Sequence, residues 1–249
     1  MEYLSNIFDD FDKVVKGEIE IVCNKPTIAL AITARTGSTQ LCSVLESMKV
    51  FGSPDEIFNT RGVVQNIKKR TGACSFVDYI NKLTGTDSPC FSFKTSWKDF
   101  EPVTPVYRKL FPQIKFFFLD RFDVVSQAFS LYKAIETGRW HSNASTRNEV
   151  AGLSADQIDA YRIQELMKSL IQEKYMWEKF FFTERLVVHH FYYEIIKNDW
   201  AAASKIMAKE FGFDSVETGE GRYNRLSGPE DEALIEKFKK IHGYSWVSV

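Results

Sequence analysis

The chain has 249 residues, a formal net charge of −1 and 44% hydrophobic residues, a composition typical of a globular protein. That length suits one large domain or two small ones, and the near-neutral charge argues against a nucleic-acid partner. No apolar run approaches the roughly 18 residues that a transmembrane helix needs. The acidic N-terminus also lacks the pattern of a secretory signal, so we expect a cytoplasmic protein.

The cysteines give no sign of a metal centre. Cys23, Cys42, Cys74 and Cys90 are widely spaced and form no CxxC pair. This spacing argues against a zinc site and favours a set of reduced thiols. We therefore expect no bound metal.

Apolar periodicity predicts the elements in chain order. An N-terminal helical extension (1–26) carries a helical face over 7–15, and short apolar runs predict strands at 27–34, 90–97, 114–121 and 186–193. Helical spacing predicts helices at 38–48, 123–137, 155–182 and 198–212. Alternating strands and helices predict a single α/β domain over 1–249 with a mostly parallel central sheet flanked by helices. The polar or Gly-containing segments 141–156 and 214–230 are expected to be loops near the site.

The sequence TARTGSTQ (33–40) lies between the first predicted strand and a predicted helix. Backbone N–H groups at such a turn converge on one point, and the helix dipole adds positive charge there, which suits an anion. Gly37 permits the tight turn, Ser38 and Thr39 can donate hydroxyls, and Arg35 supplies a planar cation matched to phosphate or sulfate oxygens. A simple helix cap explains the same residues. These few residues alone leave both interpretations open.

The same loop argues against one class of enzyme. It lacks the Gly-Lys-Ser/Thr ending of a nucleoside-triphosphate loop, whose lysine and hydroxyl contact phosphates and magnesium. The loop therefore argues against ATP or GTP hydrolysis. It remains compatible with a P-loop-like anion site after the first strand.

Four segments in order carry a resemblance to a known family: ARTGSTQLCSVLESMKVFGSPDEIF (34–58), DRFDVVSQAFSLYKAIETGRWH (120–141), EKYMWEKFF (173–181) and FYYEIIKN (191–198). Over about 27–240 the chain resembles the bacterial trehalose 2-sulfotransferase family, which is related to lipopolysaccharide and nodulation-factor sulfotransferases. Thr36 stands where that family usually has Ser, and Gln40 where it has Leu. Thr36 keeps the hydroxyl, whereas Gln40 has no explanation in the sequence.

The resemblance implies transfer of a sulfuryl group from 3′-phosphoadenosine 5′-phosphosulfate (PAPS) to a carbohydrate hydroxyl without a metal. The 5′-phosphosulfate would lie in the loop formed by Arg35, Thr36, Gly37, Ser38 and Thr39. Positive charge from Arg35 would stabilise the charge that develops on the bridging oxygen. Relatives sulfate glycolipids, oligosaccharides or lipopolysaccharide, and because some form dimers a homodimer is expected.

A donor of this kind needs a second anion site for its 3′-phosphate. The resemblance assigns this role to Arg121, at the end of a predicted strand, and to Ser126 in the following helix. The alternative is that Arg121 pairs with Asp120 or Asp123 on a surface turn. Arg225 is a further candidate for the phosphate, or a solvated loop charge.

The acceptor hydroxyl must lose a proton, so a base is expected. The resemblance assigns this role to Glu56. The stretch SPDE (53–56) is also a well-formed capping box, in which Glu56 would bond the backbone and do no chemistry. We favour the base.

Other polar residues have two interpretations each. Lys94 matches a family lysine and would neutralise the transferring group, or it is a solvated lysine at a strand end. His189 and His190 lie in an apolar strand and suit a core or edge position, whereas Trp140 and His141 are candidates for contact with the acceptor.

Three functions remain in competition. The leading hypothesis is a PAPS-dependent carbohydrate sulfotransferase. The alternatives are a P-loop-type phosphotransferase, weakened by the absent Gly-Lys-Ser/Thr, and a non-catalytic nucleotide-binding protein on the same fold, for which Thr36 and Gln40 would be signs of drift.

Overall fold

The structure, a computed structural model, describes residues 3–140, 158–223 and 229–244. Its described part contains a four-stranded sheet of β1 (Thr27–Ile32), β2 (Phe91–Ser96), β3 (Ile114–Asp120) and β4 (His189–Tyr192). The strand order is β2-β1-β3-β4 and all neighbours are parallel. All four strands were predicted within a few residues of these bounds, and the α/β fold with a parallel sheet is confirmed.

Strand β1 lies in the middle of the sheet and every one of its residues is buried. Alanines at 29 and 31 face one core, while the larger Ile28, Leu30 and Ile32 face the other. A strand covered on both faces reads as a continuous apolar run, as TIALAI does. The register pairs Ile32 with Ser96 of β2 and with Leu119 of β3. The carboxyl ends of the strands therefore meet at one edge.

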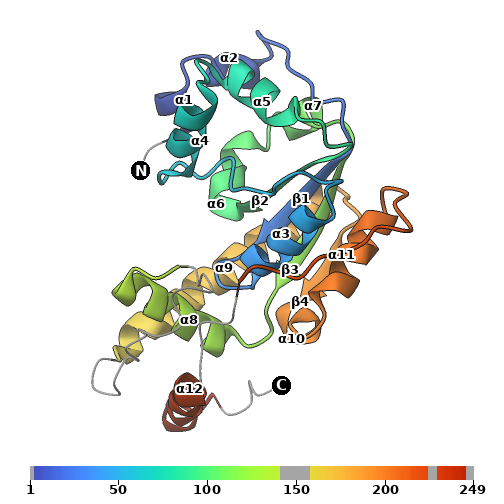
Figure 1. The fold of residues 1–249 in the computed structure, drawn as a ribbon. Coiled ribbons are helices and arrows are strands. Elements are labelled where there is room, and N and C mark those ends of the chain that lie inside the picture. The colour runs from blue at the N-terminus through green and yellow to red at the C-terminus, as the bar shows by residue number, and fades with distance from the viewer. Residues whose placement is uncertain (1–2, 141–157, 224–228, 245–249) are drawn as a thin grey trace.

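Helices cover both faces of the sheet (Figure 1). One core is formed with α3 (Ser38–Ser47) and α11 (Trp200–Lys209), and the other with the N-terminal helices and the C-terminal half of α9 (Ala160–Thr183). A third core joins α8 (Val124–Thr137), the start of α9 and α12 (Pro229–Ile241). The remaining elements are α4 (Val63–Thr71), α5 (Phe76–Thr84), α6 (Trp97–Phe100), a 3-10 turn at Glu101–Val103, α7 (Tyr107–Leu110) and α10 (Tyr193–Ile196).

The predicted N-terminal helix is in fact two short helices, α1 (Leu4–Ile7) and α2 (Phe11–Lys16). The break between them lets the Asp10 carboxylate accept hydrogen bonds from the amides of Phe76 and Val77, at 2.6 and 3.1 Å. These amides begin α5 and have no partner within their own helix. The role of Asp10 as a cap for α5 thus explains why α1 and α2 are separate helices. Helices α4, α5 and α12 were not predicted.

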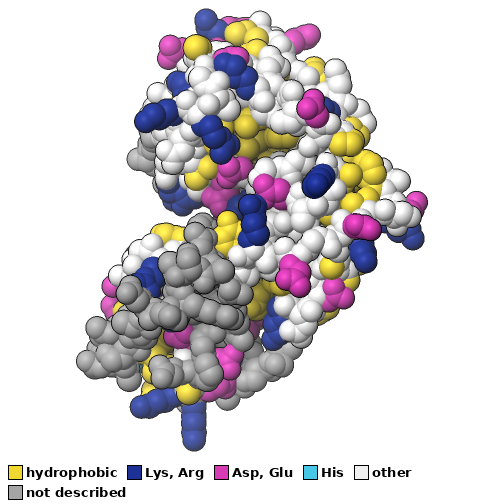
Figure 2. Space-filling view, viewed as in Figure 1, with side chains coloured by type: hydrophobic (Ala, Val, Ile, Leu, Met, Phe, Trp, Pro, Cys, Tyr) yellow, Lys and Arg dark blue, Asp and Glu magenta, His cyan; other side chains and the backbone are white. Residues whose placement is uncertain are grey.

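Within the described ranges, no helix is both long and apolar enough to cross a membrane. Viewed as in Figure 1, the surface is hollowed across its middle, and acidic and basic side chains meet there (Figure 2).

Candidate active site

The turn between β1 and α3 has the backbone expected of an anion loop. Gly37 is the N-cap of α3 and adopts a left-handed conformation, with φ 79°. A Cβ added there would lie 2.5 Å from the Trp200 ring and 3.0 Å from Tyr193, so glycine is required for space as well as for φ. Ser38 and Thr39 begin the helix and do not cap it through their side chains. The first amides of α3 point outward from its positive end.

The Thr36 hydroxyl is turned inward. It donates to the Thr33 carbonyl at 3.0 Å, and Thr36 is fully buried. Gln127 of α8 fastens the same turn by donating to the Thr33 hydroxyl at 2.8 Å and to the Ala34 carbonyl at 2.7 Å. The side chain at 36 therefore holds the loop in shape, which explains why Thr can stand for Ser there.

The Arg121 side chain reaches the loop at the backbone of Arg35. Arg35 has φ 66°, and its guanidinium donates to Ser130 Oγ at 3.0 Å and to the Trp140 carbonyl at 2.7 Å. Arg121 Nη1 lies 3.4 Å from the Arg35 carbonyl oxygen. Burial and the neighbouring charge of Arg121 lower the pKa of Arg35. Arg121 thus contacts the backbone of the loop, while the Arg35 guanidinium is held by Ser130 and the Trp140 carbonyl.

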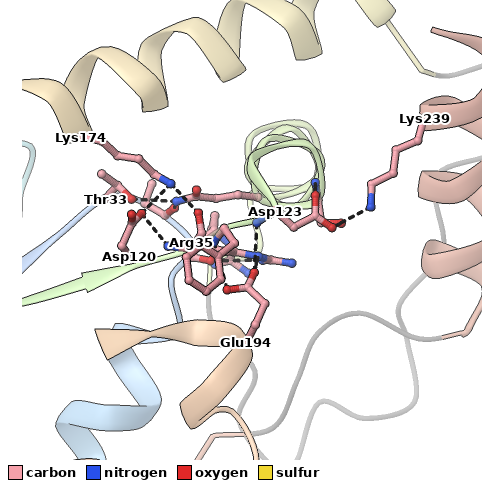
Figure 3. A network of polar contacts seen from close by, with 12 residues as sticks. Thr33, Arg35, Asp120, Asp123, Lys174, Glu194 and Lys239 are labelled. Carbon is pink, nitrogen blue, oxygen red and sulfur yellow. Dashed lines mark hydrogen bonds and ion pairs between the residues drawn. The ribbon is translucent and has the colours of Figure 1, made fainter. Parts of the chain in front are cut away.

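Arg121 pairs with a carboxylate other than the two expected: its side chain lies beside Glu194, while its backbone amide donates to Asp120 Oδ1 at 2.6 Å. Its Nε lies 3.6 Å from Glu194 Oε1, and its guanidinium lies over the Tyr193 ring, 4.6 Å from the centroid. Glu194 also accepts from the amides of Phe122 and Asp123, so it holds the turn after β3 as well (Figure 3).

Ser126 lies in the first turn of α8, where Asp123 is the N-cap. Its amide and hydroxyl both donate to the Asp123 carboxylate, at 2.9 and 2.5 Å. Lys239 reaches Asp123 from α12 at 2.8 Å (Figure 3). Burial opposes the ionised form, but Lys239 and Ser126 together lower the pKa of Asp123. The cap fixes Ser126 beside the turn that carries Arg121.

Lys94 is the most buried cation near the loop, with 8% of its side chain exposed. Its ammonium donates to Thr39 Oγ1 at 3.2 Å and lies 3.3 Å from Glu56 Oε1. Burial works against the charge, but Cys42 and Glu56 outweigh it and raise the pKa of Lys94. The interpretation of Lys94 as a lysine in open water is therefore wrong.

The capping box predicted at 53–56 does not form. Residues 53–56 begin no helix; Asp55 instead forms a parallel bridge with Phe93 of β2, which brings Glu56 to Lys94. Burial would raise the pKa of Glu56, but Lys94 and a hydrogen bond from Asn59 lower it below its ordinary value. Glu56 is therefore a carboxylate at neutral pH.

Helix α9 fastens three strand ends with one short stretch. Glu173 accepts from the Trp97 amide after β2 at 3.0 Å, Lys174 pairs with Asp120 at the end of β3 at 2.5 Å, and Trp177 donates to the Ile32 carbonyl of β1 at 3.1 Å. Figure 3 shows Lys174 reaching from α9 to Asp120. These contacts set the edge of the sheet on which the loop and Arg121 lie.

The structure also explains Gln40. Its Oε1 accepts from the Tyr223 amide at 2.9 Å, Ser43 Oγ accepts from the Arg222 amide at 3.1 Å, and Ser47 Oγ accepts from the Gly219 amide at 2.8 Å. Residues 219–223, which we call the strap, therefore cross the outer side of α3. A leucine at position 40 would leave the Tyr223 amide without this acceptor.

Other predicted positions are peripheral or undescribed. The Trp140 side chain is exposed, whereas His141 and Arg225 lie outside the described residues. His189 and His190 lie on β4, an edge strand, as expected, next to Glu210 and Glu178. All four cysteines are free thiols. In the described part of the chain, no group of three or more His, Cys, Asp or Glu is arranged to hold a metal.

A model of the Stf0 sulphotransferase family matches residues 93–240, more than half of the chain. The chain belongs to the Stf0 sulphotransferase family. The family match includes Lys94, Arg121 and Ser126 but begins after the loop and Glu56. No curated protein matches the chain.

Solved structures similar to this chain include three bacterial sulfotransferases. A sulfotransferase from Alicyclobacillus acidocaldarius is 12% identical, with 87% of this chain and 92% of that chain covered and a TM-score of 0.47. The sulfotransferase domain from the curacin biosynthetic pathway is 9% identical, with 88% and 98% covered and a TM-score of 0.47. The sulfotransferase domain from the Synechococcus PCC 7002 olefin synthase is 13% identical, with 87% and 88% covered and a TM-score of 0.43.

Sequence reasoning missed the residues that hold this Stf0-family site together. Gln127, Lys174, Trp177 and Glu194 all lie within segments quoted for the resemblance, so the resemblance could have assigned them a role. Asn59 lies just outside those segments and carried no signal, because a single amide in a turn has many ordinary uses.

Proposed function

We propose that the protein transfers a sulfuryl group from PAPS to a carbohydrate hydroxyl. The observation that carries the proposal is the position of Lys94, whose ammonium contacts both Thr39 at the start of α3 and the Glu56 carboxylate. One buried cation thus joins the predicted phosphosulfate loop to the predicted base. The family supplies the class of reaction, sulfuryl transfer; the donor, the acceptor class and the role of each residue are the proposal.

The described residues fit a phosphosulfate nucleotide. Gly37 opens the backbone at the amino end of α3, Lys94 faces that end from β2, and Arg35 and Arg121 add two cations across the turn. PAPS when bound would supply the activated sulfuryl group, attached to phosphate through an oxygen. We assign the 5′-phosphosulfate to residues 35–39, and the 3′-phosphate to Arg121 and Ser126, with Arg225 as a further candidate.

The protein's own residues then divide the work. Lys94 and the α3 amides stabilise negative charge on the group being transferred and on the oxygen that leaves it. Glu56 takes the proton of the acceptor hydroxyl. As the proton leaves, the oxygen of that hydroxyl bonds to sulfur, and the bond between sulfur and the bridging oxygen of PAPS breaks. Lys94 holds the Glu56 carboxylate ionised until that proton arrives.

The acceptor class rests on the resemblance alone. A glycolipid, an oligosaccharide and a lipopolysaccharide core all offer suitable hydroxyls, and trehalose is one simple candidate. A homodimer and a cytoplasmic location stay predictions.

Ligand-dependent melting separates the proposal from its rivals. The desulfo product, adenosine 3′,5′-bisphosphate, should raise the melting temperature without magnesium, since a ligand that binds the folded state stabilises it. A phosphotransferase would instead respond to ATP with magnesium. A binding protein without chemistry would respond to the bisphosphate but would move no labelled sulfate from PAPS to any glycan.

A further inference from the structure

The Glu56 carboxylate is held at both oxygens. Lys94 Nζ lies 3.3 Å from Oε1, and Asn59 Nδ2 donates to Oε2 at 2.5 Å. Asn59 is buried, with 9% exposed. Its backbone N–H donates to the backbone carbonyl of Glu56 at 2.9 Å, which closes a tight turn. A carboxylate held at one oxygen can still rotate about its last torsion, because that torsion has broad minima. A second partner on the other oxygen fixes the plane.

Arg61 fixes the orientation of the side-chain amide of Asn59. Its Oδ1 accepts from the Arg61 amide at 2.9 Å and from Arg61 Nε at 3.3 Å. Two donors at one end of the amide identify that end as the oxygen, so the NH₂ group must face Glu56.

Arg61 is anchored in turn to the end of β2. Its Nη2 lies 2.8 Å from Asp99 Oδ2, which also accepts from Ser96 Oγ at 2.6 Å. A continuous chain of polar contacts therefore runs from the last residue of β2 through Asp99, Arg61 and Asn59 to Glu56. Lys94, on the same strand, contacts the other oxygen of the Glu56 carboxylate.

We propose that Asn59 is a positioning residue for Glu56. It sets the direction of the carboxylate and stabilises its ionised form, so that the lone pairs not used by Lys94 and Asn59 face the acceptor hydroxyl. The inference rests on the proposed role of Glu56 as base, and it adds that Asn59, oriented by Arg61, determines how well that base works.

The pH dependence provides a readout that a purely structural role would not move. The charged and titratable groups facing Glu56 are Lys94 from β2, Cys42 from α3, and Asp55, Arg61 and Asp99. The hydrogen bond from Asn59 favours the carboxylate, so its loss raises the pKa of Glu56. The acid limb of kcat then moves to higher pH while the nucleotide site is untouched.

The experiment compares the wild type with Asn59→Ala and Asn59→Asp. For Asn59→Ala we expect kcat to fall about 10-fold, the size of one lost charge-assisted hydrogen bond, and its acid limb to move to higher pH. Affinity for adenosine 3′,5′-bisphosphate should stay within about twofold, because Asn59 does not contact residues 35–39. Asn59→Asp should move the limb further, since it places a second carboxylate beside the first.

Asn66→Ala is the matched control, because Asn66 is exposed on α4. Arg61→Ala should reproduce the Asn59→Ala effect in weaker form, since it removes only the group that orients the amide. If Asn59→Ala unfolds, Asn59→Asp carries the test. An unchanged kcat–pH profile in the variants overturns the proposal, and so does a parallel loss of kcat and nucleotide affinity.

A carboxyl ¹³C titration of Glu56 keeps this inference separate from the proposed function. If the wild type transfers no sulfate but Asn59→Ala still raises the pKa of Glu56, the assignment of the base fails while the coupling to Asn59 stands. If the wild type is active and that pKa does not move, the positioning role is wrong.

Discussion

Lys94 Nζ lies 3.3 Å from Glu56 Oε1, with 8% and 27% of the two side chains exposed. Neither charge is well hydrated, so each depends on the other. The pair exists because Asp55 joins the edge of β2 at Phe93 and carries Glu56 to the strand from which Lys94 projects.

Replacing Lys94 should affect chemistry and stability together. In Lys94→Met the transferring group loses a buried cation, so kcat should fall by roughly 10²-fold or more. Glu56 would be left as a partly buried charge without its main partner, at a cost of about 3 kcal/mol in unfolding free energy. Single-turnover rates and urea titrations measure the two effects. Lys98→Met is the control, since Lys98 is exposed four residues further on; equal effects from both variants would contradict the account.

The two arginines should both contribute to nucleotide affinity. Arg35→Ala and Arg121→Ala each remove a charged donor beside the turn and should weaken adenosine 3′,5′-bisphosphate binding about 10- to 100-fold. Isothermal titration at fixed ionic strength measures the change. Arg162→Ala, on the exposed side of α9, should leave affinity unchanged. Unaltered binding in both arginine variants would remove the assignment of the two anion sites.

Glu173 should make stability depend on pH below neutrality. Burial and the nearby Asp99 raise its pKa to about 7, although the hydrogen bond from the Trp97 amide opposes this. A raised carboxyl pKa means that the folded state binds the proton more tightly than the unfolded state. The stabilisation is therefore complete below the ordinary carboxyl pKa of 4.5 and is lost as pH rises to about 7.

The expected loss across that window is about 3 kcal/mol, from about 1.4 kcal/mol per pKa unit. Urea denaturation at a series of pH values should show this slope in the wild type. Glu173→Gln keeps an acceptor for the Trp97 amide and should flatten the slope, whereas Glu165→Gln on the same helix should not. If the unfolding free energy of Glu173→Gln still falls with pH as in the wild type, another group causes the pH dependence.

Gln40→Leu tests the strap across α3. The Tyr223 amide would lose its acceptor, so amide exchange within residues 219–223 should quicken by about 5- to 10-fold, the equivalent of about 1 kcal/mol. Ser43→Ala should have a similar effect through the Arg222 amide. Gln172→Leu is the control, since Gln172 is exposed on α9. No change in exchange with Gln40→Leu would mean that other contacts hold the strap.

Much of the fold could be predicted because the central strands β1 and β3 are largely buried on both faces. TIALAI (27–32) and FFFL (116–119) are short, fully buried runs dominated by apolar residues, the pattern of a strand covered on both sides. Helices α4 and α12 escaped prediction because both are highly charged helices with narrow apolar faces.

The site was predictable where backbone geometry dictates residue type. Gly37 and Arg35 follow from the strand-loop-helix pattern, whereas the expected roles of Arg121 and Lys94 came from the family resemblance. The capping box at 53–56 was equally consistent with local sequence, and a tertiary contact overrode it: the bridge of Asp55 to Phe93. Asn59 and Glu194 act through partners distant in sequence or through turn geometry, which a linear pattern does not encode.

The most direct test of the central claim is transfer of labelled sulfate from PAPS to a panel of glycans, by the wild type and by Glu56→Gln. The account predicts magnesium-independent transfer to at least one carbohydrate by the wild type. It also predicts that Glu56→Gln transfers roughly 10²-fold more slowly and binds adenosine 3′,5′-bisphosphate almost as tightly. Equal rates from the two proteins, or wild-type transfer that requires magnesium and ATP, would contradict it.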